Sequence, residues 1–385
     1  MLSITTVSAA DDPSTTLEKI PEPIIQADSA ILIESSTGRV IFEKNADEKR
    51  PPASMTKMMT CILGLENLTK RTQVLISETA AYTEDNTFYW TPGDIIHAED
   101  INLGMMMVSD NGAAVAIAQS ISGTIPLFSR LMNHKAKLLG CTNTNFVNPN
   151  GLPNENHYST ARDMARIAMY GMTIPDFRDI VSTKKAIIRW QSPADKFAEA
   201  ENTNELLDKY EGMNGIKTGW TRAAGGCLAA SAIRGDTELI AIIMHSTDMD
   251  TRFDDARKLL DYGFKRVKMT RTINRDRVEK VVFVRDGERA TIHVRPMKDL
   301  NFPLLDGENP KKLKVNYDLP KIVDAAIKKG DIVGNAELKY NDKVLSSVPL
   351  IADETVNKGF SITSTLVGFM EPVIDIAQSI VFFFA

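Results

Sequence analysis

Short apolar runs and helical periodicities divide the first two thirds of the chain. Two apolar runs, at 29–34 and 39–43, are typical of β-strands, and the Ser-Ser-Thr-Gly segment between them predicts a hairpin turn. Strand-like runs return at 227–233 and 238–244. Apolar residues recur at helical spacing at about 54–68, 101–122, 124–139, 160–171 and 251–262. Strands at both ends with helices between them predict one α/β (α+β) domain, residues 27–264, in which distant segments share a sheet flanked by helices.

The pattern changes after residue 264. Two strand-like runs, at 279–284 and 289–294, flank Asp286-Gly287, a dipeptide that favours a tight hairpin turn. Alternation of apolar and polar residues resumes at 334–340 and 343–350. These patterns predict a small C-terminal all-β domain, residues 276–352, joined to the first domain by a short basic linker.

The beginning of the chain has no folding pattern of its own. Residues 1–10 are small and uncharged, and Val7, Ala9 and Ala10 suit the cleavage site of a secretory signal, although a positive stretch and a long apolar stretch are missing. Residues 11–26 are rich in Asp, Pro, Ser and Thr. We expect residues 1–26 to be a signal-peptide remnant, or simply a polar leader, followed by a flexible lead-in.

The end of the chain carries an apolar stripe at helical spacing between residues 360 and 385 and finishes with Phe382, Phe383 and Phe384. Two acidic residues, Glu371 and Asp375, argue against a membrane-spanning helix. The stripe could pack on a domain, but the terminal phenylalanines favour an amphipathic helix in the membrane interface. The two ends therefore predict an extracytoplasmic protein held at a membrane surface.

Composition narrows the function classes. The 385 residues include 45 basic and 50 acidic ones, and no basic block is dense enough to follow a phosphate backbone, so nucleic acid is not an expected partner. The three cysteines, Cys61, Cys141 and Cys227, cannot make a disulfide framework and show no CxxC spacing. Cys61 and Cys227 lie in apolar runs and are expected in the core.

Metal, cofactor and histidine-based chemistry have little support. The sequence has no HExxH pair, no phosphate-binding glycine loop and no GxSxG elbow. The five histidines are scattered at His97, His134, His157, His245 and His293. We therefore predict no metal and no cofactor. A nucleophile, if present, needs an activating group other than histidine.

Lysine is the candidate activator. Ser54 and Lys57 enter an apolar helical pattern three residues apart, so the ammonium can lie beside the hydroxyl on one helix face. A nearby positive charge that lowers the pKa of the lysine would let its neutral form accept the serine proton. The spacing is weak evidence alone, because Ser54 could simply bond to its own backbone. Ser182 and Lys185 share the spacing without a helix start.

Two further motifs strengthen this interpretation. Ser109-Asp110-Asn111 follows one apolar helical pattern and precedes another, and Lys217-Thr218-Gly219 immediately precedes a strand. Each could be an ordinary cap or turn. Together, in the order SxxK, SDN and KTG, they are the signature of serine β-lactamases and penicillin-binding proteins.

The chain resembles the low-molecular-mass penicillin-binding proteins that act as serine D-alanyl-D-alanine carboxypeptidases. Segment 148–163 is similar to the family's stretch between its second and third motifs, and segments 202–207 and 210–221 are similar to the stretch leading through its third. The resemblance runs from about residue 25 to the end. It implies a β-lactamase/transpeptidase-like catalytic domain, a C-terminal β domain and a helix that anchors the protein peripherally on the outer face of the bacterial cytoplasmic membrane.

The resemblance also implies roles for the motif residues. Ser54 would attack the penultimate D-alanine carbonyl of a peptidoglycan pentapeptide, with Lys57 as the base. Ser109 would relay a proton to the leaving amine, and Asn111 would hold the substrate amide. Lys217 would keep Lys57 neutral and attract the substrate carboxylate.

The remaining site residues would bind the end of the substrate. Thr218 and Arg252 would hold its carboxylate, Gly219 continues the binding strand, and the backbone N–H groups of Ser54 and Trp220 would form the oxyanion hole. Trp220 stands where relatives often have histidine or tyrosine.

Two alternatives remain open at this point. A serine β-lactamase would need a deacylating carboxylate, for which Glu155 is a poorly placed candidate, so we expect β-lactam antibiotics to form a slowly hydrolysed acyl-enzyme. A non-enzymatic cell-wall scaffold would have no use for both Ser54 and Lys57.

Overall fold

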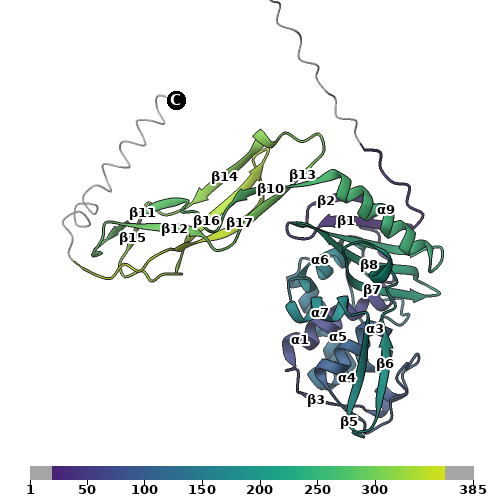
Figure 1. The fold of residues 1–385 in the computed structure, drawn as a ribbon. Coiled ribbons are helices and arrows are strands. Elements are labelled where there is room, and N and C mark those ends of the chain that lie inside the picture. The colour runs from purple at the N-terminus through teal and green to yellow at the C-terminus, as the bar shows by residue number, and fades with distance from the viewer. Residues whose placement is uncertain (1–19, 360–385) are drawn as a thin grey trace, which may run out of the picture.

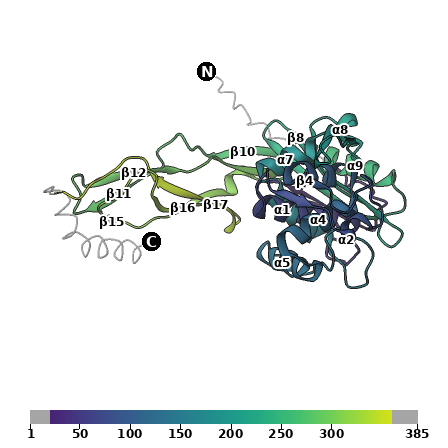
Figure 2. The same cartoon turned by 90° about the horizontal axis from the view of Figure 1, so that it is seen from below.

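The computed structural model describes residues 20–359, which form two bodies (Figure 1). An α/β body contains the sheet and most helices, and an elongated all-β body extends from one end of it (Figure 2). The predicted signal remnant in residues 1–19 and the predicted anchor helix in residues 360–385 lie outside the described residues. The fold class expected from the sequence is confirmed.

One five-stranded antiparallel sheet organises the α/β body, in the order β2-β1-β9-β8-β7. As predicted, it joins segments from both ends of the domain. Its strands are β1 (Ser29–Glu34), β2 (Val40–Lys44), β7 (Met213–Thr221), β8 (Gly225–Arg234) and β9 (Thr237–Ser246).

Both faces of this sheet are buried. Ile31 and Ile33 of β1 enter the larger core, on the side of the helices, whereas Ala30 and Leu32 enter a second core beneath helix α9 (Thr251–Arg266). Because neighbouring residues serve two different cores, β8 and β9 read as nearly continuous apolar runs. This is why the sequence predicts these two strands well.

The helical part packs on the face opposite α9. Its elements are η1 (Ala53–Thr56), α1 (Lys57–Asn67), α2 (Glu78–Ala81), α3 (Ala98–Val108), α4 (Asn111–Ser122), α5 (Ile125–Leu138), α6 (Ala161–Gly171) and α7 (Pro175–Ser182). The short helix α8 (Leu206–Lys209) lies on the other face, where Leu206 joins the core beneath α9. A small sheet of four short strands flanks them, in the order β3 (Gln73–Leu75), β4 (Ile95–His97), β5 (Lys185–Ser192) and β6 (Phe197–Glu201). The sequence analysis did not identify this small sheet.

The helical periodicity predicted at 101–122 is divided between two helices, because the chain breaks between α3 and α4 at the SDN motif. Ser109 adopts a left-handed conformation with φ 67°, and the Asp110 side chain caps α4 by accepting a hydrogen bond from the Ala113 N–H. The apolar periodicity continues across the break, so in the sequence only the capping residues Ser109 and Asp110 indicate where it lies. It places the SDN motif at a helix junction.

The all-β body begins earlier than predicted. The expected linker after residue 264 consists of the end of α9 and strand β10 (Val267–Ile273), which pairs with β13 (Leu300–Leu305). The main sheet has the order β14-β16-β17-β12-β11-β15. Its strands are β11 (Lys280–Arg285), β12 (Thr291–Pro296), β14 (Leu313–Asp318), β15 (Ile322–Asp324), β16 (Ile332–Tyr340) and β17 (Lys343–Ala352), with a short η2 turn at Pro310–Lys312.

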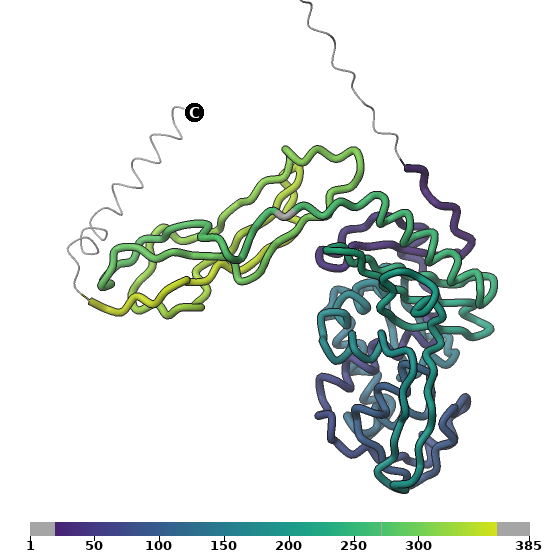
Figure 3. The backbone as a smooth tube through the Cα atoms, viewed as in Figure 1, coloured from purple at the N-terminus to yellow at the C-terminus, as the bar shows by residue number. Residues whose placement is uncertain are grey.

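Arg39 links the two bodies. It lies beside β2 at the end of the β1–β2 turn, and its Nη1 donates a hydrogen bond to the Pro303 carbonyl at 2.6 Å. Its guanidinium also pairs with Glu308 and stacks 5.0 Å from the centre of the Phe302 ring. These three contacts tie one arginine of the α/β body to residues 302–308 of the all-β body. The tube in Figure 3 shows the chain passing directly from α9 into β10 at this junction.

The lead-in predicted to be flexible up to residue 26 is fixed at its end. Ile25 is buried, and the N–H groups of Gln26 and Ala27 donate to the buried Asp255 carboxylate at 2.9 and 2.8 Å. These contacts come from α9, more than 200 residues away in sequence, so local composition could not reveal them.

Between residues 20 and 359, no single helix is long and apolar enough to cross a membrane; α4 and α5 meet the requirement only as a pair, and they are bent by 86°.

Candidate active site

Ser54, Lys57 and Asn111 meet at one point between the helical part and the main sheet. The Lys57 Nζ lies 2.9 Å from Ser54 Oγ and donates to Asn111 Oδ1 at 2.7 Å. A third contact, at 2.8 Å, runs to the backbone carbonyl of Asn150. The structure therefore brings together the SxxK motif and the asparagine of the SDN motif, as the sequence predicts. Asn150 was not predicted, because a backbone carbonyl leaves no residue-type signal.

A tight turn presents Ser54 at the start of α1. Ala53 has a φ of 48°, and Ser54 lies in the single turn of η1, half-buried, with Lys57 fully buried one turn later. Gly151 packs directly on this turn, with a φ of +89°, and an added Cβ there would lie 1.9 Å from the Ala53 carbonyl oxygen. Only glycine fits this position. The close approach holds the 148–151 loop, and with it the Asn150 carbonyl, over Lys57.

Burial lowers the pKa of Lys57 to about 7, and the carboxylates of Asp110 and Asp85 partly oppose this shift. The sequence predicts that nearby positive charge lowers this pKa. The structure shows that loss of hydration is the main cause. At neutral pH a substantial fraction of Lys57 is therefore neutral, which is what a general base requires.

Lys217 and Thr218 lie on β7, beside the nucleophile turn. An added Cβ at Gly219 would lie 3.0 Å from the Ser54 backbone nitrogen, so the strand passes directly along the turn. Lys217 is 1% exposed, and its Nζ donates to the Thr218 carbonyl at 3.0 Å. Burial, followed by the charges of Lys57 and Arg252, lowers the pKa of Lys217 well below its ordinary value. The two lysines therefore disfavour each other's protonation.

Arg252 lies next to the KTG motif, as the family resemblance implies. It is in the first turn of α9, only 7% exposed, and its Nη1 donates to the Gly219 carbonyl at 2.8 Å. Its buried Nε has no hydrogen-bond partner among the described residues. A buried cationic donor without a partner is costly unless an anion completes it. Together with Lys217 and Thr218, Arg252 makes this end of the site suited to a carboxylate.

Thr203 contacts the KTG motif, although no motif in the sequence indicates a role for it. Its hydroxyl lies 2.6 Å from the hydroxyl of Thr218, and its N–H donates to the Met107 carbonyl at 3.1 Å. Thr203 thus links the KTG strand to the end of α3, where Ser109 lies. The only sequence signal was the similarity of segment 202–207.

Trp220, the next residue along β7 after Gly219, is 54% exposed at the edge of the site.

The SDN motif is held by its middle residue. The buried Asp110 carboxylate accepts hydrogen bonds from the Phe88 N–H at 3.0 Å and from Trp90 Nε1 at 2.8 Å, in addition to capping α4. Asn111 uses both ends of its amide, because its Nδ2 donates to the Glu84 carbonyl at 3.0 Å. A substrate amide would therefore share or replace one of the bonds of Asn111.

The two remaining candidates lie apart from this chemistry. Glu155, the candidate for a deacylating carboxylate, is exposed. The nearby residue that contacts Lys57 is Asn150, through its backbone carbonyl. Ser182 ends α7 and Lys185 begins β5, so the second SxxK spacing spans two different elements.

All three cysteines are buried and free, and the core positions predicted for Cys61 and Cys227 are confirmed.

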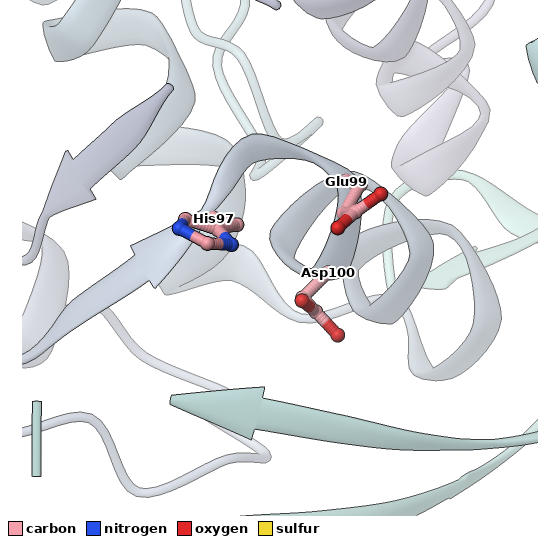
Figure 4. Close-up of side chains that lie close together, drawn as sticks. All are labelled: His97, Glu99 and Asp100. Carbon is pink, nitrogen blue, oxygen red and sulfur yellow. The ribbon is translucent and has the colours of Figure 1, made fainter. Parts of the chain in front are cut away.

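One group of side chains could offer several ligand atoms to a metal, although no metal is predicted from the sequence. Among residues 20–359, the donor atoms of His97, Glu99 and Asp100 lie within 4.8 Å of one another. Figure 4 shows His97 at the end of a strand, with the two acids on the first turn of the helix that follows. The guanidinium of Arg71 contacts both Glu99, at 3.1 Å, and His97, at 3.3 Å. Acids in a first helical turn complement the helix dipole, and this group lies at the opposite end of α3 from Ser109.

Comparison with known proteins identifies relatives of both bodies. A family model described as D-alanyl-D-alanine carboxypeptidase matches residues 16–248, and one described as penicillin-binding protein 5, C-terminal domain, matches residues 268–358. The chain is 34% identical to the D-alanyl-D-alanine carboxypeptidase DacF of Bacillus subtilis over 343 residues, covering 88% of each chain. It is 32% identical to DacC of Escherichia coli, covering 89% of this chain and 87% of that one.

A solved structure agrees with these relatives. Penicillin-binding protein 5 from Haemophilus influenzae superposes with a TM-score of 0.70 at 29% identity, covering 88% of this chain and 99% of that one. The similarity therefore extends over both bodies.

Proposed function

This chain belongs to the D-alanyl-D-alanine carboxypeptidase family, and we propose that Ser54 is the nucleophile with which it releases the terminal D-alanine of peptidoglycan stem pentapeptides. The protein is a serine-type D-alanyl-D-alanine carboxypeptidase and a penicillin-binding protein. Its substrates are peptidoglycan peptides ending in D-Ala-D-Ala, and β-lactams bind to it. The serine β-lactamase and the non-enzymatic scaffold are not favoured.

The observation that carries the proposal is the set of three contacts around Lys57 Nζ. A neutral amine has two N–H groups and one lone pair. The carbonyl oxygens of Asn111 and Asn150, at 2.7 and 2.8 Å, are pure acceptors and take the two N–H groups. The lone pair is then left for the hydroxyl of Ser54 at 2.9 Å. Lys57 is thus oriented as a base, and burial supplies its neutral form.

The acylation step follows from this arrangement. Ser54 Oγ forms a bond to the carbonyl carbon of the penultimate D-alanine while its proton passes to Lys57 Nζ. The tetrahedral oxyanion is stabilised by the backbone N–H groups of Ser54 and Trp220. When the C–N bond breaks, the leaving D-alanine amine takes a proton from Lys57 through the Ser109 hydroxyl. Water then attacks the acyl-enzyme, restores Ser54 and releases the shortened peptide.

Recognition of the terminal carboxylate is assigned to the Lys217 side of the site. Thr218 donates its hydroxyl, and Arg252 supplies a buried cationic Nε without a protein partner in the described residues. Lys217 contributes its ammonium when the carboxylate arrives, because an anion raises the pKa of a buried lysine. An ester or amide in place of the carboxylate is therefore expected to be a poor substrate.

The direct test is D-alanine release from a pentapeptide ending in D-Ala-D-Ala, comparing wild type with Ser54→Ala. Release by wild type and none by the variant is expected. Release that survives the substitution would show that another residue is the nucleophile. A folded wild type that releases no D-alanine, but is labelled by a fluorescent penicillin, would confine the failure to the substrate.

We also propose that the protein is extracytoplasmic and lies peripherally on the outer face of the bacterial cytoplasmic membrane through residues 360–385. The support is the apolar stripe and the three terminal phenylalanines in the sequence. Flotation with phosphatidylglycerol-containing vesicles should retain the full chain and lose a chain ending at residue 359. A full chain with Phe382, Phe383 and Phe384 replaced by serine is the matched control, and it should also be lost. Equal retention of all three would refute the proposal.

A further inference from the structure

His157 lies directly behind the nucleophile turn, although no part of the proposed reaction uses it. It follows the 148–151 loop and is 2% exposed. Its Nε2 lies 2.8 Å from the hydroxyl oxygen of Thr56, a residue between Ser54 and Lys57. Its Nδ1 lies 3.2 Å from the backbone nitrogen of Val147. The imidazole therefore bridges the turn that bears the nucleophile and the strand-like segment that leads into the 148–151 loop.

The contacts determine which nitrogen carries the proton. The Val147 N–H can only donate, so Nδ1 must accept and has no proton. Nε2 then carries the proton and donates it to Thr56 Oγ1. Burial also lowers the pKa of His157 to about 4, so the ring is neutral at physiological pH. A neutral histidine held in one tautomer donates one hydrogen bond and accepts another in fixed directions. A general base, by contrast, must take up and release a proton.

This connector is one of three hydrogen bonds between the start of α1 and the loop. Lys57 Nζ donates to the Asn150 carbonyl at 2.8 Å, and the Thr60 hydroxyl donates to the Pro149 carbonyl at 2.6 Å. The close packing of Gly151 leaves little freedom between them: an added Cβ there would lie 2.9 Å from Thr56 Oγ1. The bond from His157 to Thr56 thus closes a ring of contacts that includes the Asn150 carbonyl.

We propose that His157 is a positioning residue for the general base. By donating to Thr56, it keeps the nucleophile turn and the 148–151 loop in register, so that the Asn150 carbonyl holds one N–H of Lys57 and the lone pair points at Ser54. The inference rests on the proposed roles of Ser54 and Lys57. It assigns a task to a buried histidine that contacts no reacting atom.

Two substitutions separate the two nitrogens of His157. His157→Gln places an amide donor near the position of Nε2 and retains donation to Thr56. His157→Asn places an amide oxygen near the position of Nδ1 and retains acceptance from Val147 only. Both variants remove the ring. Because Asn is one methylene smaller than Gln, the Phe146→Leu control below separates the effect of lost packing from the loss of the donor. We expect the maximal rate of acylation by a fluorescent penicillin to fall about three- to tenfold more in His157→Asn than in His157→Gln. The half-saturating penicillin concentration for acylation should change little in either.

Thr56→Val tests the other end of the bond in a nearly isosteric way. Alone, it should lower the acylation rate by about the same three- to tenfold. In the His157→Asn background it should add little, because the bond is already lost. Phe146→Leu is the packing control, since the Phe146 ring lies edge-on to His157 with 5.6 Å between ring centres, and it should leave the acylation rate near wild type.

Several results would overturn the inference. Equal acylation rates in His157→Gln and His157→Asn, a wild-type rate in Thr56→Val, or additive effects of the two substitutions would each show that the bond does not position the base. A loss in Phe146→Leu as large as that in His157→Asn would assign the effect to packing. Failure of the proposed nucleophile is a separate result, because it would appear as penicillin labelling that persists in Ser54→Ala.

Discussion

The two bodies of this protein differ in the polarity of their buried side chains. The core of the α/β body contains charged groups such as Lys57, Lys217 and Asp110, whereas the core of the all-β body is formed by apolar residues. Among residues 20–359, every buried polar or charged side chain lies between Ser29 and Asp255. Since burying a charge is costly, this contrast indicates that the first body gives up stability to maintain its site, and the second does not.

Replacing the central lysine should produce the largest effect. Lys57→Met keeps the length of the side chain and removes the base, so acylation by penicillin should fall by at least about a thousandfold. The variant should also be more stable than wild type, because a buried amine with a lowered pKa is replaced by an apolar group. The folded protein releases the Lys57 proton near pH 7, whereas the unfolded chain keeps it to about 10.5. The gain in unfolding free energy should therefore be largest at and below pH 7 and shrink as the pH rises.

Chemical denaturation and labelling of the same preparations would measure both effects. Lys57→Met that is both inactive and clearly less stable than wild type would contradict the contrast between the bodies. In that case Lys57 would be contributing to stability through its three hydrogen bonds.

The matching change in the all-β body should affect stability alone. Leu350 is fully buried on β17, and Leu350→Ala should lower the unfolding free energy by about 2–5 kcal/mol. Because Leu350 is remote from Ser54 in sequence and lies in the other body, acylation measured well below the melting temperature should match wild type. A proportional loss of acylation at low temperature would mean that the second body supports the site directly.

The pH dependence of acylation sharpens the account of the site. In the proposed reaction only neutral Lys57 can accept the serine proton, and burial lowers the pKa of Lys57 to about 7. The acylation rate should therefore fall about tenfold for each pH unit below 7 and level off above it. Stopped-flow labelling between pH 5 and 9 would show this profile. A rate independent of pH in this range would indicate a base with a very different pKa.

The smallest effect is expected at the exposed edge of the site. Trp220 is 54% exposed, and its contribution to the proposed oxyanion hole comes from its backbone N–H. Trp220→His should therefore change the rate of D-alanine release by only a few fold, and mainly through KM, since surface substitutions usually change energies by about 0.5 kcal/mol or less. A loss comparable to that of Lys57→Met would give the indole ring a direct role in the reaction.

Much of the site was predictable because it is formed by particular side-chain types at fixed spacings in the sequence. Ser54, Lys57 and Asn111 belong to short motifs, and the structure brings them within hydrogen-bonding distance of one another around Lys57. The strands β8 and β9 were equally visible, because burial on both faces makes them continuously apolar. Where a function needs a particular side chain, or a strand needs a particular pattern, the sequence alone determines the outcome.

Other features depend on how distant segments pack. The acceptor that orients Lys57 is the backbone carbonyl of Asn150, which any residue type could supply. The lowered pKa of Lys57 comes from burial, a property of the surrounding core and not of its neighbours in sequence. Strands of three residues such as β3 and β4, and the break at Ser109, have too few residues for a clear periodicity. The sequence by itself therefore determined which side chains are candidates for the reaction. Only the tertiary structure decided how they are oriented and charged, because orientation and hydration are set by the whole fold.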